Sequence, residues 1–239
     1  MAFDLRALVQ AERGCVLRPC AYFVAWNGVL TMVYDGFPPV LARIKARLNE
    51  QDLAPENFGS LWPKTTLGAL HDDAPPLSLS ELTSLRALCE EHASKLTLQL
   101  PVKALSIVAY DQRSLESCVR RSDVDLQDGC DDAEPSAEER ARVRGVLDEW
   151  SDLEAYLPRV NESGSRISSY RELSPRGVTL VAFIGTFELR TLVASFRSAV
   201  DAQLPSRYVW LGDDALHCTV RALRSAESSN PRRWRYGVV

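Results

Sequence analysis

The sequence predicts an α+β protein of two pseudo-symmetric lobes, each with a small antiparallel-rich sheet and outer helices, facing across a central cleft. Apolar segments alternate along the chain between the periodicities of strands and of helices. Two glycine pairs with the same spacing, Gly28 with Gly36 and Gly177 with Gly185, each bracket a strand-like segment that passes into an amphipathic helix. A short motif strand follows each helix, so the order strand, helix, motif strand occurs twice.

Length and composition describe an ordinary globular protein. The chain has 239 residues, 46% of them apolar and 25% charged, which suits a single bilobal domain over residues 1–239. The formal net charge of -4 gives no global reason to bind nucleic acid, so an anionic ligand needs a local basic site. No apolar run is long enough to cross a bilayer, and residues 1–16 do not resemble a signal peptide. We therefore expect a cytoplasmic protein without a membrane partner.

Cysteines and histidines give no metal pattern. The six cysteines include no CxxC pair, so we expect reduced thiols. The three histidines do not lie at ligand spacing with any cysteine pair, which predicts no metal and no cofactor. Serine hydrolase, phosphate-loop and dinucleotide-binding classes are also disfavoured, because their glycine-containing motifs are missing from the sequence.

The first lobe is expected over residues 20–110, after a short helix at 3–12. Segments 22–26 and 29–34 have strand character, and Asn27-Gly28 between them is typical of a hairpin turn.

A helix then begins at Pro38-Pro39. Its apolar residues recur at helical spacing, while Lys45 is among the side chains expected to face outward. The motif strand 65–70, a capped helix over 78–96 and strands at 97–101 and 104–110 complete the lobe.

Residues 121–174 are more acidic and polar, and we interpret them as an acidic loop plus a helical insertion. The aspartates lack the glycine and terminal glutamate of a calcium loop, so we expect a solvated loop. A helix over 135–157 has an apolar stripe and is expected to act as a lid or outer brace.

The second-lobe core is expected over residues 175–224. It contains a strand at 177–183, a helix at 187–204 and strands at 208–211 and around His217. The basic tail, 225–239, is either an RNA contact or a solvated terminus.

Two motif strands contain the candidate site. Lys64-Thr65-Thr66 and His217-Cys218-Thr219 each place a nitrogen base two residues before a threonine. Because strand side chains alternate between faces, each base shares a face with its threonine, and a groove between the strands can hold a phosphate. The same alternation turns Cys218 to the opposite face.

Several neighbours are further candidates. Arg221 lies two residues after Thr219, so it is either a phosphate ligand on the same face or a surface arginine. Tyr34, Trp62 and Tyr110 either stack on a base or pack in the core.

With these motifs, the chain resembles the two-histidine phosphoesterase superfamily, which includes RNA ligase-like cyclic phosphodiesterases. His217-Cys218-Thr219 matches the second H-x-T/S motif of that family, whereas Lys64-Thr65-Thr66 has lysine at the position of the first histidine. The resemblance implies that His217 acts in metal-independent acid/base chemistry on a 2′,3′-cyclic phosphate RNA end or a cyclic nucleotide. It also implies that Thr66 and Thr219 bind the phosphate oxygens.

Lys64 leaves three interpretations open. It is a catalytic acid opposite His217 in a cyclic phosphodiesterase-like hydrolase, or it only binds the anion in a non-catalytic nucleotide- or RNA-binding descendant. In the third, Lys64 points to solvent and His217 is a structural histidine. The chain is then a protein scaffold whose protein partner uses residues 121–135 or the basic tail.

Overall fold

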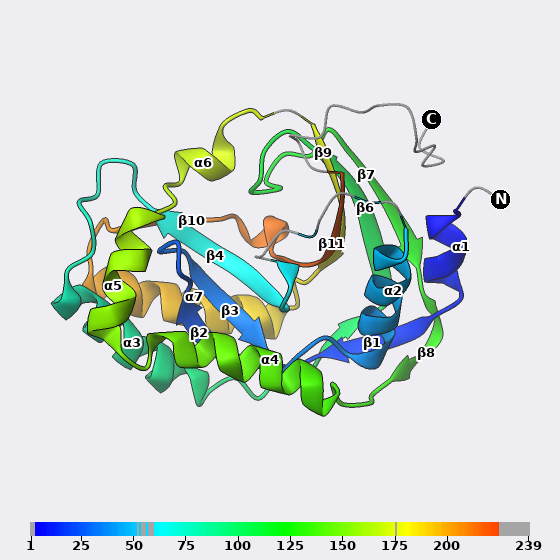
Figure 1. The fold of residues 1–239 in the computed structure, drawn as a ribbon, viewed down its shortest axis with the longest axis horizontal. Helices are drawn as coiled ribbons and strands as arrows, with labels where there is room; N and C mark the ends of the chain where they lie inside the picture. Colours follow the sequence, from blue (N-terminus) through cyan, green and yellow to red (C-terminus); the bar gives the residue numbers. More distant parts are fainter. Residues whose placement is uncertain (1–2, 52, 54–55, 57–59, 175, 225–239) are drawn as a thin grey trace.

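The structure, a computed structural model, describes residues 3–51, 53, 56, 60–174 and 176–224 (Figure 1). It is an α+β protein with two lobes, each built on a four-stranded antiparallel sheet. The predicted basic tail, 225–239, lies outside the described residues.

The sheet of the first lobe has the strand order β10-β4-β3-β2. Every neighbouring pair in it is antiparallel. The predicted hairpin joins β2 to β3, and Gly28 in its turn has a φ of +76°, which favours glycine. The strands are β2 (Pro19–Val24), β3 (Leu30–Tyr34), β4 (Lys64–Leu70) and β10 (Tyr208–Trp210).

The sheet of the second lobe has the order β11-β9-β6-β7 and is also antiparallel throughout. A smaller sheet of order β5-β1-β8 lies beside it, with β1 and β8 parallel. The strands of these two sheets are β6 (Ala104–Tyr110), β7 (Arg120–Asp125), β9 (Gly177–Phe183), β11 (His217–Arg224), β1 (Arg13–Leu17), β5 (Leu100–Val102) and β8 (Gln127–Asp131).

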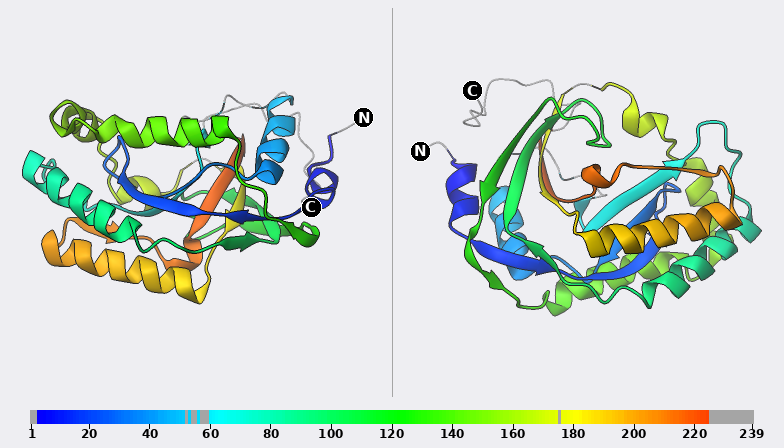
Figure 2. Two further views of the ribbon diagram at one scale, coloured as in Figure 1. Left: turned by 90° about the horizontal axis from the view of Figure 1, so that it is seen from below. Right: turned by 180° about the vertical axis from the view of Figure 1, so that it is seen from behind.

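Helices cover both faces of the first sheet (Figure 2). Tyr22 on β2 stacks on Phe196 of α7 with ring centroids 4.0 Å apart. Its neighbour Phe23 points the other way, and its ring centroid lies 4.9 Å from that of Trp150 in η2. Alternation along β2 therefore places aromatic side chains against helices on both sides. The helices of this lobe are α3 (Leu79–Ala93), α4 (Ala137–Leu147), η2 (Asp148–Trp150), α5 (Leu153–Glu162) and α7 (Phe187–Gln203).

Two further helices contact the second sheet. Helix α2 (Pro39–Asn49) packs against β11, and α1 (Leu5–Gln10) packs against β7. The short elements α6 (Ser168–Arg171) and η3 (Asp213–Ala215) lie in connections. Among the described residues, no helix has the length and apolar character required to cross a bilayer.

The sheets do not follow the lobe boundaries predicted from the sequence, 20–110 and 175–224. Strand β6 of the first segment pairs with β9, and β10 of the second segment pairs with β4. Gly68 on β4 allows β10 to pair beside it, because a Cβ at that position would lie 2.6 Å from Cε3 of Trp210. Each sheet therefore contains strands from both halves of the chain.

The acidic segment also differs from its prediction as a loop in 121–174. It forms the edge strands β7 and β8. Strand β7 pairs with β6 along its length, and its Val124 side chain is buried. A strand with one neighbour and one solvated face needs few apolar residues, so its composition resembles that of a loop. The helix predicted over 135–157 is broken, because the Asp152 side chain accepts hydrogen bonds from two backbone N–H groups and begins α5.

Helix α3 begins with a capping box that provides a test of its local stability. The Ser78 hydroxyl accepts from the backbone N–H of Glu81 at 3.2 Å, and the Glu81 carboxylate accepts from the backbone N–H of Ser78 at 2.8 Å. We expect Ser78→Ala to lower the free energy of unfolding by about 1 kcal/mol in urea denaturation. The matched variant Ser80→Ala, at an exposed position inside the same helix, should change it by less than about 0.5 kcal/mol. Equal effects of the two variants would contradict the capping role.

Candidate functional site

Strands β4 and β11 bring the two motif strands together at the junction of the lobes. The Thr65 hydroxyl donates to the backbone oxygen of His217 at 3.0 Å, so its single proton is used. The Tyr34 hydroxyl, 2.7 Å from the same Thr65 oxygen, is then the donor to it. This buried chain of hydrogen bonds joins the first sheet directly to His217.

A small pocket opens on the other face of both strands. It is lined by Trp62, Lys64, Thr66, His217 and Thr219 and has a cavity volume of about 50 Å³. A single water needs roughly 10–15 Å³ of such space, so the pocket has room for a small anion. Four of the five predicted site residues thus line one cavity, as strand alternation predicts.

His217 is arranged as a proton acceptor. Its Nδ1 lies 2.7 Å from the backbone oxygen of Ala215, and because a carbonyl only accepts, Nδ1 bears the proton. In the neutral ring, Nε2 then has the lone pair. Burial lowers the pKa of His217 below its ordinary value, the bond to Ala215 raises it, and the charge of Lys64 lowers it. The imidazole is therefore neutral at pH 7, with the Nε2 lone pair as its proton acceptor.

Lys64 is the cation of the pocket. Its ammonium lies 4.2 Å from the centroid of the Trp62 ring, whose face attracts positive charge. Burial lowers the pKa of Lys64 to about 8, and the charge of Lys45 acts in the same direction. At pH 7 the ammonium is charged, yet it gives up its proton far more readily than an exposed lysine.

The aromatic candidates have different positions. Tyr34 is fully buried and belongs to the core. Trp62 is also buried, at 2% exposure, but it forms part of the pocket wall beneath Lys64. Tyr110 is half-buried against Gly177, where an added Cβ would lie 2.5 Å from its ring. Of the two roles open to these rings, packing describes Tyr34 and Trp62, and neither Tyr34 nor Tyr110 lines the pocket.

Arg221 does not share the face of Thr219, which corrects its prediction as a phosphate ligand. The β11–β9 register shifts between Thr219 and Arg221, so a bulge at Val220 resets the alternation. The Arg221 side chain is buried on the side of α2, where its Nε donates to Oδ1 of Asn49 at 2.8 Å.

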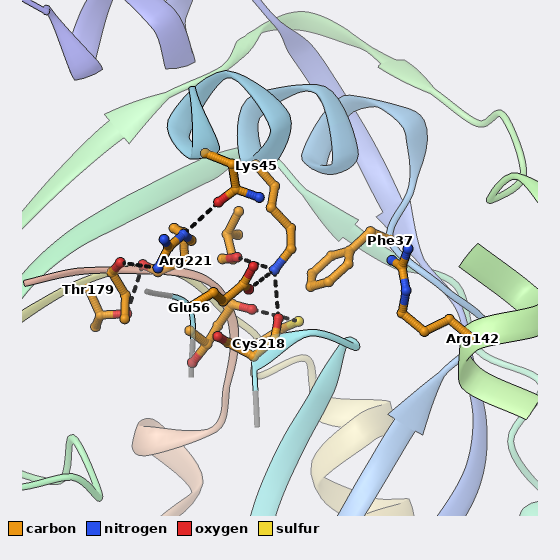
Figure 3. Close-up of polar contacts among 12 residues, drawn as sticks. Phe37, Lys45, Glu56, Arg142, Thr179, Cys218 and Arg221 are labelled. Atoms are coloured by element: carbon orange, nitrogen blue, oxygen red, sulfur yellow. Dashed lines mark hydrogen bonds and ion pairs between the residues drawn. The ribbon is translucent and has the colours of Figure 1, made fainter. Parts of the chain in front are cut away.

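Behind the pocket, Lys45 supports the bulged strand (Figure 3). It forms an ion pair with Glu56 and donates to the backbone oxygens of Ser60 at 2.6 Å and Val220 at 3.3 Å. Lys45 is 8% exposed rather than outward-facing, and burial lowers its pKa. Its position four residues after Leu41, on the apolar side of the helix, was the sequence signal for this burial.

Cys218 lies on that same rear side of β11, as alternation predicts. It is fully buried, and burial raises the pKa of its thiol to about 12. At neutral pH it is therefore an unreactive thiol rather than a nucleophile. All six cysteines are free.

The part of the chain that the structure describes offers no alternative metal centre. No group of three or more His, Cys, Asp or Glu side chains there is arranged to hold a metal ion. The chain matches no family model, no curated protein and no solved structure. The geometry of the pocket is thus the basis for a functional conclusion.

Proposed function

We propose that the protein binds a phosphodiester, either a 2′,3′-cyclic phosphate RNA end or a cyclic nucleotide, and hydrolyses it without a metal. The observation behind this proposal is the convergence of Lys64, Thr66, His217 and Thr219 on one pocket. A cation, two hydroxyl groups and a neutral imidazole are a suitable set for a phosphoryl group. The resemblance of the two motifs to the two-histidine phosphoesterases supports the same reaction class.

In the proposed reaction, the Thr66 and Thr219 hydroxyls donate to the non-bridging oxygens of the phosphate. His217 Nε2 takes a proton from the attacking water as the new O–P bond forms. The bond from phosphorus to the leaving sugar oxygen breaks, and Lys64 gives that oxygen its proton. The product is a phosphomonoester, and proton transfer through solvent restores both residues.

The pocket has room for the phosphoryl group but not for a nucleoside, so sugar and base would lie outside it. A cytoplasmic location is part of the proposal, because six free cysteines suit a reducing compartment.

A non-catalytic binding module is the alternative, favoured by one residue. Lys64 is an ammonium at the position where the family that the chain resembles has its first motif histidine. An ammonium near a phosphate binds it without needing to transfer a proton. This alternative predicts ligand affinity without turnover.

The test is single-turnover hydrolysis of a dinucleotide with a 2′,3′-cyclic phosphate, together with calorimetric binding of the corresponding 2′- and 3′-phosphate monoesters. Hydrolysis in EDTA supports the metal-independent enzyme. Binding without hydrolysis selects the binding module. If the protein neither binds nor cleaves, both forms of the proposal are wrong.

A further inference from the structure

Beside the pocket, the second sheet presents an aromatic residue next to His217. The antiparallel register pairs His217 on β11 with Phe183 on β9, so both side chains lie on the same face of the sheet. Their ring centroids are 5.9 Å apart. Phe183 is half-buried and therefore continues the wall of the site beyond the cavity itself.

Arg121, from the edge strand β7, places its guanidinium over the ring of that phenylalanine. Its Cζ is 4.0 Å from the centroid of the Phe183 ring. Together with the ring spacing above, this places the guanidinium within about 10 Å of the His217 imidazole. An arginine at the far edge of the sheet thus reaches back toward the site.

The arginine is held in this position by a second set of contacts. Its Nε donates to Oδ1 of Asp123 at 2.8 Å, and the Ser106 hydroxyl donates to the same carboxylate. These hydrogen bonds lower the pKa of Asp123, so the carboxylate stays ionised. Its charge offsets that of Arg121, which makes the pair poorly suited to a second phosphate but leaves the planar guanidinium available for stacking.

One side of the guanidinium faces Phe183, and the Arg121 side chain as a whole is 44% exposed. The solvent-exposed surface of the Arg121 side chain is therefore the one that does not contact the Phe183 ring. Nucleobases stack on arginine planes as well as on aromatic rings, and each has a π-face for this purpose.

We propose that Arg121, supported by Phe183, is a stacking site for the nucleobase of the ligand whose phosphate occupies the pocket. The inference rests on the proposed function and extends it, because it names the side chain that binds the nucleobase and requires the base to contribute to affinity. The base would be bound on β7 of the second sheet, and the phosphate between β11 of that sheet and β4 of the first.

The test compares two equilibrium ligands that the protein does not consume, adenosine 3′-phosphate and the base-free methyl riboside 3-phosphate, by isothermal titration calorimetry. We expect the wild-type protein to bind the adenosine compound about 5- to 100-fold more tightly. Arg121→Ala should remove most of this advantage. Arg121→Lys should remove it as well, because a lysine retains the charge but has no planar group.

The matched control is Arg120→Ala. The neighbouring residue on β7 points to the other face of the sheet, so its loss should leave the affinity ratio unchanged. Equal affinity of the two ligands for the wild-type protein would overturn the stacking site alone, since the phosphate would still bind. An advantage retained in Arg121→Lys would also overturn it in favour of a charge contact. Binding of neither ligand would overturn the proposed function and this site together.

Discussion

Replacing His217 with alanine should lower the single-turnover rate on a 2′,3′-cyclic phosphate by about 100- to 10,000-fold. The imidazole is the group in the pocket whose basic nitrogen is unprotonated at pH 7, since Ala215 holds the proton on Nδ1. Binding of the phosphate product should fall much less, because Lys64 and the two threonines remain. His217→Ala should therefore lose rate while retaining most of its affinity for the phosphate product.

The matched control for this variant is His71→Ala. His71 follows β4 directly, is exposed and interacts with Asp73. Its side chain does not line the pocket, so its removal should leave the rate within about twofold. If His71→Ala lost as much activity as His217→Ala, or if His217→Ala kept the wild-type rate, the assignment of His217 as the base would be wrong.

The second large effect concerns Lys64 and should be visible in the pH profile. The rate should rise with pH as His217 loses its proton, at a pKa below the ordinary histidine value. It should fall again as pH passes about 8, because the proton that Lys64 donates is then lost. The expected profile is a bell with its maximum near neutral pH.

Two substitutions of Lys64 distinguish a residue that donates a proton from one that only binds the phosphate through its charge. Lys64→Ala should weaken phosphate binding and lower the rate by at least about 100-fold. Lys64→Arg should retain phosphate affinity yet lose a similar part of the rate, because a guanidinium does not release its proton at these pH values. Single-turnover rates measured by stopped flow or quench flow between pH 5 and pH 10, at increasing protein concentration, give both the rate constant and the affinity for the cyclic phosphate. An arginine variant with the wild-type rate and no fall at alkaline pH would make Lys64 a phosphate-binding cation only.

Much of the site could be predicted from the sequence, because the alternation of side chains along a strand is a local pattern. Strand side chains alternate with a fixed period of two, so Lys64 with Thr66 and His217 with Thr219 had to share faces wherever their strands lay. The α+β class was determined in the same way, by periodicity and by the Asn27-Gly28 turn.

Other parts of the site depended on contacts between distant segments. The bond from Thr65 to the His217 backbone joins two strands that are far apart in the chain, and no local pattern indicates it. Lys45 was expected at the surface, yet its ammonium is buried because Glu56 and two carbonyl oxygens satisfy it there.

The sequence by itself therefore determined which elements form and which side chains share a strand face. The tertiary structure decided the order of the strands, the exchange of β6 and β10 between sheets, and the side to which Arg221 points. The reason is that periodicity is a property of one segment, whereas strand order and the bulge after Thr219 depend on hydrogen bonds to partners elsewhere in the chain. A single extra residue in β11 was enough to turn Arg221 from the pocket to the core.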